Sequence, residues 1–259
     1  MLKAVVMDMD GTLLNEENKI SNRTREYLIS LQKKGVKLVL ASGRSYTRLL
    51  PYARQLKMDE YGGWLIEVDG IAVYDVKNRE RTKFRTMDPE EIRGVFTWLT
   101  GTTAESQAMF DDGIFDFIPD YAWELKKQIR RKQNLPEDFP WTAGPWGWLT
   151  DFRDGYPNIM YIKSADEISR PLNKIQLMDE EDRLEGIYRQ LQEKFGHEFS
   201  IYRTTPRQLE ILPLGFSKGR AVRNLMESQG WQRDEVAVFG DGENDVAMFD
   251  EADYSYAMD

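Results

Sequence analysis

Short apolar runs alternate with amphipathic segments along the first part of the chain. A short apolar run bounded by polar residues is typical of a buried parallel strand, and apolar positions that recur every three or four residues predict a helix. Ser21 is a candidate N-cap of one helix, which Gly35 would end. The first predicted elements are strand 4–7, the helix after Ser21, strand 36–40, helix 46–56 and strand 64–66. This order implies right-handed crossovers and a parallel sheet with helices on its faces.

The end of the chain repeats this rhythm, whereas the middle does not. The later predicted elements are strand 209–212, helix 218–227, strand 236–239, helix 245–249 and strand 254–257. The middle mixes alternating and helical patterns and holds five of the seven tryptophans. We therefore predict an α/β protein, with a Rossmann-like parallel-sheet core formed by residues 1–83 and 208–259. An inserted α+β domain, residues 84–207, interrupts that core.

Composition excludes several classes of protein. The chain has no cysteine, which excludes a disulfide scaffold, a thiolate zinc site and a cysteine nucleophile. Its net charge of −9 argues against broad binding to nucleic acid or to an anionic membrane surface, although it is compatible with a local basic pocket. The sequence has no apolar window of about 18 residues, and its first apolar run is too short for a secretory signal. We expect a cytoplasmic protein with no membrane or nucleic-acid partner.

Four short polar pieces lie next to predicted strands. Residues 8–13 read Asp-Met-Asp-Gly-Thr-Leu after the first strand, and residues 42–44 read Ser-Gly-Arg after the second. Lys218 begins the helix after the fourth strand, and residues 240–245 read Gly-Asp-Gly-Glu-Asn-Asp after the fifth. The carboxyl ends of parallel strands form the ligand crevice of an open α/β sheet. We therefore expect these four remote pieces to meet at one site.

The residue types in these pieces suit chemistry on a phosphate ester. Clustered carboxylates repel one another and raise the pKa of at least one member unless a cation lies among them, and all-oxygen ligands favour Mg²⁺ when the substrate is a phosphate. An aspartate can attack phosphorus as a nucleophile. A neighbouring carboxyl can protonate the leaving oxygen and then activate water. Lys218 and the hydroxyl of Ser42 can hold phosphate oxygens.

Each piece also has a purely structural interpretation when it is taken alone. Asp-x-Asp-Gly is common in turns and calcium loops, but the EF-hand template requires glycine where Leu13 and Val246 stand in the two candidate loops. Ser-Gly-Arg alone is typical of a strand-to-helix turn. Lys218 alone is typical of a solvated helix start, and its surroundings lack the Gly-Lys-Ser/Thr order of a P-loop. The joint occurrence of the four pieces favours a common site.

Together, the four pieces resemble the four motifs of the haloacid-dehalogenase-superfamily phosphatases. The long insertion resembles the large α/β cap of the Cof-like sugar-phosphatase subfamily, so the resemblance covers nearly the whole chain. It implies that Asp8 is the nucleophile and that Asp10 is the general acid and base. It also implies a Mg²⁺ ion bound by the side chains of Asp8 and Asp241 and by the backbone carbonyl of Asp10.

The same resemblance implies roles for the remaining motif residues. Ser42 and Lys218 would hold the phosphoryl group, Asn244 would orient it, and Asp245 would support the metal shell. The expected protein is a phosphoric monoester hydrolase that acts on small phosphorylated metabolites, above all sugar phosphates, through an aspartyl-phosphate intermediate. Two alternatives stay open: a phosphomutase similar to phosphomannomutase, and a phosphometabolite-binding regulator without turnover.

Several residues keep two interpretations at this stage. Arg44 either reaches the substrate or pins a loop. Asp69 stands where members of the family commonly have asparagine. Trp141, Trp146 and Trp148 either stack on a sugar or form a small apolar core in the insertion. The sequence determines neither the physiological substrate nor the oligomeric state.

Overall fold

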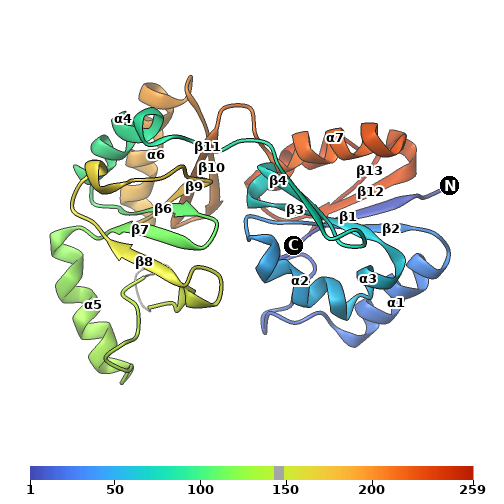
Figure 1. The fold of residues 1–259 in the computed structure, drawn as a ribbon, viewed down its shortest axis with the longest axis horizontal. Helices are drawn as coiled ribbons and strands as arrows, with labels where there is room; N and C mark the ends of the chain where they lie inside the picture. The colour runs from blue at the N-terminus through green and yellow to red at the C-terminus, as the bar shows by residue number, and fades with distance from the viewer. Residues whose placement is uncertain (143–148, 259) are drawn as a thin grey trace. The chain divides into compact units, whose positions relative to one another are not determined.

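The computed structural model describes residues 1–142 and 149–258 and divides the chain into two compact units (Figure 1). The first unit comprises Met1–Arg85 and Gly215–Asp259, and the second comprises Thr86–Leu214. Each unit has its own sheet and its own apolar core. The second unit is therefore an insertion into the first, and its junctions lie two and seven residues after the predicted boundaries at 83/84 and 207/208.

The first unit is built on a seven-stranded sheet in the order β13-β12-β1-β2-β3-β4-β5. Neighbouring strands from β13 to β3 run parallel, and β4 and β5 add an antiparallel edge. Each of these parallel strands was predicted from the sequence. The strands of this sheet are β1 (Ala4–Asp8), β2 (Lys37–Ala41), β3 (Gly63–Glu67), β4 (Ala72–Asp75), β5 (Glu80–Lys83), β12 (Val236–Gly240) and β13 (Tyr254–Ala257).

Helices cover both faces of this sheet (Figure 1). One apolar cluster joins the sheet to α1 and α2, and a second joins the opposite face to α7 and α8. The predicted caps of α1 are present: the Ser21 side chain accepts a hydrogen bond from the Thr24 backbone N–H, and Gly35 follows the end of the helix with a φ of 90°. The helices of this unit are α1 (Asn22–Lys33), α2 (Tyr46–Gln55), α3 (Met58–Tyr61), α7 (Lys218–Gln229) and α8 (Val246–Phe249).

The second unit has a six-stranded mixed sheet in the order β10-β11-β9-β6-β7-β8. The pairs are antiparallel except for β7 with β8, and α4 and α6 pack on one face through a large apolar cluster. The elements of this unit are α4 (Pro89–Thr100), β6 (Glu105–Phe110), β7 (Gly113–Phe117), α5 (Asp120–Lys132), β8 (Asn158–Tyr161), β9 (Lys174–Met178), α6 (Glu181–Phe195), β10 (Phe199–Thr205) and β11 (Gln208–Pro213). This is the expected α+β insertion.

The strand predicted at residues 209–212 belongs to the other sheet. As β11 it pairs antiparallel with β9 and β10, so its assignment to the parallel core was wrong. Leu209 and Ile211 face the apolar core of the second unit. The error has a simple physical cause, because an apolar run indicates a buried strand but not the sheet that buries it. Lys218 therefore follows a connection between the two units and does not follow a parallel strand.

Trp141 takes part in a small cluster within the second unit. Its ring meets that of Trp123 edge to face, with 5.7 Å between the centroids, and the guanidinium of Arg130 lies 3.3 Å from its ring centroid. These contacts favour the structural interpretation of Trp141. Trp146 and Trp148 lie outside the described residues. Among the described residues, no helix is both long enough and apolar enough to cross a membrane.

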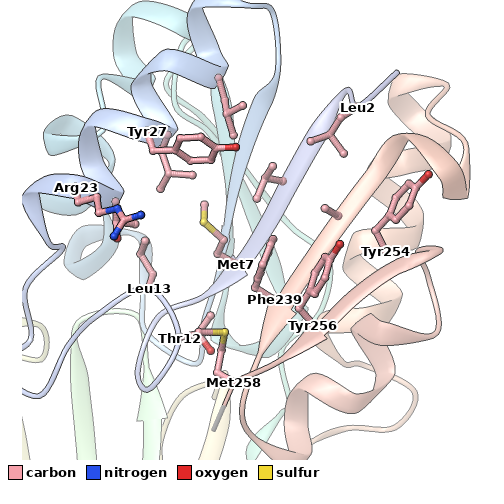
Figure 2. A pocket seen from close by; sticks show the side chains of 15 residues that line it. Leu2, Met7, Thr12, Leu13, Arg23, Tyr27, Phe239, Tyr254, Tyr256 and Met258 are labelled. Atoms are coloured by element: carbon pink, nitrogen blue, oxygen red, sulfur yellow. The ribbon is translucent and has the colours of Figure 1, made fainter.

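A cavity of about 740 Å³ lies on the α1 face of the first sheet, between α1, β12 and β13 (Figure 2). Most of its lining is apolar, including Met7, Leu28, Phe239 and Tyr256, with Arg23 as its charged residue. It is therefore poorly suited to a phosphate ester. Thr12 lines its end and connects it to the polar residues described next.

Candidate active site at the strand ends

Three of the four polar pieces meet where β1, β2 and β12 end. Asp8 is the last residue of β1, Ser42 follows β2, and Asp241 follows β12. Because β1 pairs in parallel with both of the other strands, the chain continues from all three at the same edge of the sheet. Lys218 reaches this edge as the first residue of α7. The predicted convergence is present, although Lys218 arrives by a different route.

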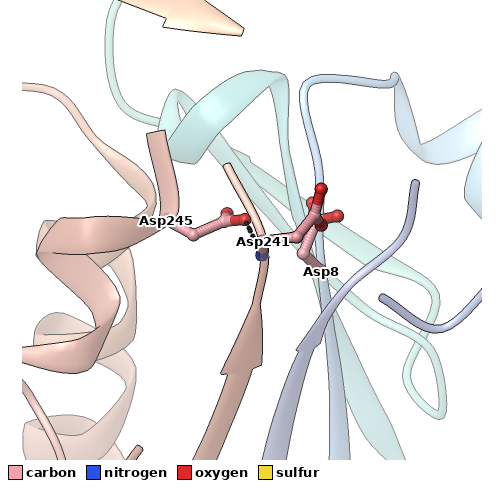
Figure 3. Close-up of side chains that lie close together, drawn as sticks. All are labelled: Asp8, Asp241 and Asp245. Carbon is pink, nitrogen blue, oxygen red and sulfur yellow. Dashed lines mark hydrogen bonds between the residues drawn. The ribbon is translucent and has the colours of Figure 1, made fainter. Parts of the chain in front are cut away.

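Three carboxylates and one ammonium form the centre of the site. Asp8, Asp241 and Asp245 each place a carboxylate oxygen within 4.8 Å of the other two (Figure 3). The Lys218 Nζ donates to Asp8 Oδ1 at 2.6 Å and to Asp245 Oδ1 at 2.7 Å. Lys218 is 2% exposed, Asp8 6% and Asp245 1%. One buried ammonium thus lies between two buried carboxylates, while Asp241 faces solvent.

Burial and neighbouring charges shift the pKa of the central groups. Burial raises the pKa of Asp8 to about 7, the Asp245 charge raises it too, and Lys218 opposes both. Burial alone would lower the pKa of Lys218, but the carboxylates around it raise that pKa well above its usual value. Lys218 is therefore a cation at neutral pH, and the group as a whole keeps an excess of negative charge that favours a further cation.

The loop after β12 folds back on itself around Asp245. The Asp245 Oδ2 accepts the backbone N–H groups of Asp241 at 3.1 Å and of Gly242 at 3.0 Å. A Cβ at Gly240 would lie 2.6 Å from the Cβ of Asp245, so only glycine fits there. With Lys218 on its other oxygen, Asp245 receives three donors. These bonds leave Asp241 turned toward Asp8.

Thr12 and Gly11 hold Asp241 from the side of β1. The Thr12 Oγ1 donates to Asp241 Oδ1 at 2.7 Å. Gly11 has a φ of +84°, and a Cβ there would lie 2.4 Å from Asp241 Oδ2. The motif needs glycine at this position for both reasons. The sequence analysis did not predict the contact between Thr12 and Asp241. The position of Thr12 inside the first motif was the signal that could have indicated it.

Asp10 lies apart from the three clustered carboxylates. Its carboxylate accepts hydrogen bonds from both Nε of Arg44, at 3.0 Å, and Nη2 of Arg44. The backbone N–H of Arg44 in turn donates to Ser42 Oγ at 3.2 Å. The structure thus joins Arg44 to two predicted site residues. The side chain of Asp10 is 57% exposed, so its carboxyl can reach a molecule from solvent.

Asp69 completes the site beside Asn244. It lies in the 3₁₀ helix η1 (Val68–Gly70) directly after β3, and its Oδ1 accepts from Asn244 Nδ2 at 3.1 Å. Val68 and Asp69 both have positive φ, 47° and 52°, which is uncommon for residues other than glycine. The aspartate that departs from the family pattern therefore contacts a motif residue. Its position after the third parallel strand was the signal that could have identified it.

The oxygen ligands of the site fit a divalent cation. Asp8 and Asp241 bring carboxylate oxygens close together, and Asp241 is open to solvent, which allows an ion to keep bound waters. The oxygens of Asp245 are engaged by Lys218 and by two backbone N–H groups, so its carboxylate supports the loop. The backbone carbonyl of Asp10 lies two residues after Asp8, in the loop that follows β1. The donor set is all oxygen, as hard cations require.

Comparison with known proteins agrees with this geometry. Residues 5–259 match the family described as haloacid dehalogenase-like hydrolase. The chain is 25% identical over 264 residues to a 5-amino-6-(5-phospho-D-ribitylamino)uracil phosphatase of Bacillus subtilis, covering 100% of this chain and 88% of the relative.

Solved structures with the same fold include two from this superfamily. A haloacid dehalogenase-like hydrolase from Bacteroides thetaiotaomicron superposes with a TM-score of 0.72 and 25% identity, covering 97% of this chain and 86% of the other. A subclass IIB sugar phosphatase superposes with a TM-score of 0.71 and 18% identity, covering 99% of this chain and 94% of the other. The predicted fold class, a parallel-sheet core with a separate mixed-sheet cap, is confirmed.

Proposed function

Because the chain belongs to the haloacid dehalogenase-like hydrolases, we propose that it is a Mg²⁺-dependent phosphatase of small phosphorylated metabolites. One observation carries the proposal: the buried Asp8 carboxylate, bonded to Lys218 and beside Asp241, lies two residues from an exposed, separately held Asp10. A nucleophile and a proton carrier are thus present at the same strand end. A pure binding protein has no need of this pair.

The first half-reaction transfers the phosphoryl group to Asp8. An oxygen of Asp8 attacks phosphorus, the bond between phosphorus and the ester oxygen breaks, and Asp10 in its acid form gives a proton to the leaving alcohol. In the second half-reaction, Asp10 takes a proton from water. The water oxygen attacks phosphorus, and the bond to Asp8 breaks. Inorganic phosphate leaves, and the Asp8 carboxylate is regenerated.

Side chains of Asp8 and Asp241 and the backbone carbonyl of Asp10 would hold Mg²⁺. The ion, when bound, offsets the repulsion between the Asp8 carboxylate and the phosphate oxygens. Lys218 would exchange its hydrogen bond to Asp245 for one to a phosphoryl oxygen. Its hydrogen bond to Asp8 would remain and keep that carboxylate oriented. This charge placement stabilises the transferring group without reorganisation during the reaction.

Ser42 and Asn244 would complete the phosphate site. The Ser42 oxygen already accepts from the Arg44 backbone N–H, so its own hydrogen can donate to a phosphoryl oxygen. Asn244 donates one amide hydrogen to Asp69 and has a second that can orient the phosphoryl group. Asp69, which stands where members of the family commonly have asparagine, therefore fixes the orientation of Asn244.

The proposed substrates are phosphate esters of sugars and polyols. The Bacillus subtilis relative is named for a phosphoribityl compound, in which the phosphate is an ester of a polyol chain. We assign the choice among such substrates to the inserted second unit, since the motif residues all lie in the first unit. The first unit would act on the phosphate common to all of them.

A phosphate-release screen across phosphorylated metabolites tests this proposal. Wild-type protein should release inorganic phosphate with Mg²⁺ and lose that activity in excess chelator. The variant Asp59→Asn is a control that should keep the wild-type activity, because Asp59 is an exposed aspartate on α3 away from the motifs. Formation of an isomeric sugar phosphate would indicate a phosphomutase, and binding without any product would indicate a regulator. Either of these results would contradict the proposal.

A further inference from the structure

Arg44 contacts two residues of the proposed active site, Asp10 and Ser42. Its guanidinium grips both oxygens of Asp10 through Nε and Nη2, which is the fork geometry that arginine offers to a carboxylate. Its backbone N–H donates to Ser42 Oγ. Its Nη1 faces the Tyr52 hydroxyl at 3.5 Å, and the guanidinium carbon lies 5.9 Å from the Tyr52 ring centroid. The arginine side chain is only 17% exposed.

These contacts argue against direct binding of substrate by Arg44. Both edges of the guanidinium already have partners, one in Asp10 and one in Tyr52. Asp10, in contrast, has a side chain that is more than half exposed. Without the two hydrogen bonds from Arg44, this exposed carboxylate would sample several orientations. It would also be drawn to any cation held by Asp8 and Asp241.

We propose that Arg44 is a positioning residue for the second half-reaction, acting through Asp10. This inference rests on the proposed phosphatase function. Two N–H groups of Arg44 occupy the two oxygens of Asp10, which is the arrangement that matches a carboxylate, and the hydrolytic step is the one that uses Asp10 as a carboxylate base. Arg44 holds that carboxylate in one orientation. The water proton then passes to an Asp10 oxygen as the water oxygen attacks phosphorus and the bond to Asp8 breaks.

Arg44→Ala separates this role from substrate binding in the hydrolysis of p-nitrophenyl phosphate. This substrate needs little acid catalysis, so its first half-reaction should proceed normally in the variant. The second should slow by about 10- to 100-fold, within the range of general-base catalysis. We expect kcat and KM to fall together, by up to that factor, and kcat/KM to stay close to the wild-type value, because kcat/KM depends only on binding and the first half-reaction. Rapid mixing should show a burst of about one p-nitrophenol per enzyme molecule, because the aspartyl-phosphate accumulates.

Three further variants make the test specific. Arg44→Lys keeps the charge but loses the fork, so its kcat should lie between those of wild type and Arg44→Ala. Arg54→Ala removes an exposed arginine from α2, the helix that follows Arg44, and should leave kcat and KM unchanged. In an Asp10→Asn background, Arg44→Ala should cause no further loss, because the two residues act as one unit. Melting temperatures of all variants identify any that fail to fold.

Opposite results would overturn the inference in distinct ways. A rise in KM with a fall in kcat/KM and no burst would show that Arg44 binds substrate directly. Independent losses in the double variant would show that it does not act through Asp10. Wild-type protein without Mg²⁺-dependent turnover would overturn the phosphatase proposal, and the role of Arg44 with it.

Discussion

Asp8 is the residue on which the proposed chemistry depends most. Asp8→Asn keeps the size of the side chain but removes the anionic nucleophile, so kcat for phosphate release should fall by about 10⁴-fold or more. The Asp59→Asn control should keep the wild-type rate. The variant should still fold, because Lys218 retains its bond to Asp245. Turnover of Asp8→Asn near the wild-type rate would exclude the covalent mechanism.

Gly11 tests whether the position of Asp241 matters. Gly11→Ala would place a Cβ 2.4 Å from Asp241 Oδ2, so this carboxylate must move. We expect the Mg²⁺ concentration for half-maximal activity to rise by about 10- to 100-fold, as for residues that orient metal ligands.

Gly35→Ala is a matched control for Gly11→Ala. Its φ is +90°, but a Cβ there meets nothing within 4 Å. Both substitutions should therefore lower the free energy of unfolding by about 1–2 kcal/mol from backbone strain. Only Gly11→Ala should change the Mg²⁺ dependence. The same change in both variants would assign the effect to strain alone.

At the scale of the elements, the contact between α7 and α8 places Lys218. A Cβ at Gly219 would lie 2.1 Å from the carbonyl oxygen of Ala247, so the two helices touch backbone to backbone. Gly219→Ala should push α7 away and lower the free energy of unfolding by about 1–3 kcal/mol. It should also lower kcat, because Lys218 is the preceding residue.

Gly186→Ala on α6 provides the comparison for Gly219→Ala. A Cβ at that helical position meets nothing within 4 Å, so alanine should raise the free energy of unfolding by about 0.5–1 kcal/mol. Chemical denaturation of both variants gives the two values. Equal changes would mean that helix propensity, and not the close approach of α7 and α8, determines the result at Gly219.

The sheet of the second unit contains a buried acid whose ionisation opposes folding. Burial raises the pKa of Asp116 on β7 well above its usual value, the Glu105 charge raises it further, and Lys126 lowers it. The folded state therefore holds this proton more tightly than the unfolded state. The stabilisation that follows from this tighter proton binding is complete below the pKa of Asp116 in the unfolded state. It is lost as the pH rises through the pKa of Asp116 in the folded state.

Asp116→Asn cannot ionise and should remove this pH dependence. The melting temperature of the variant should rise relative to wild type as the pH increases from about 5 to 8. Asp154→Asn changes an exposed aspartate of the same unit and should show no such trend. A melting-temperature difference between Asp116→Asn and wild type that is independent of pH would contradict the expectation.

At the scale of the whole molecule, the two units should be separable. Replacing Thr86–Leu214 with a short flexible linker should leave a first unit that folds, because its sheet and both of its apolar clusters lie outside the insertion. Removal of residues 84–207 alone would instead leave β11 without β9 and β10, the strands with which it pairs. The shortened protein should retain part of its p-nitrophenyl phosphatase activity and lose much more activity on sugar phosphates. Equal retention on both substrates would contradict the assignment of specificity to the second unit.

The sequence alone was sufficient for the parallel strands, for helices α1, α2, α7 and α8 of the first unit, and for the meeting of Asp8, Ser42 and Asp241. The reason is that these features depend on local pattern. An apolar run predicts a strand, a cap predicts a helix end, and parallel strands that alternate with helices must place their following residues at the same edge of the sheet.

Tertiary structure alone decided which partners distant residues take. The apolar pattern of β11 is satisfied in either sheet, so only long-range pairing with β9 and β10 determines where it lies. The bonds from Lys218 to Asp8, from Asn244 to Asp69 and from Arg44 to Asp10 join residues far apart in the chain. Local periodicity carries no information on such pairs, because a side-chain contact depends on how complete elements pack and on the charges that packing leaves buried together.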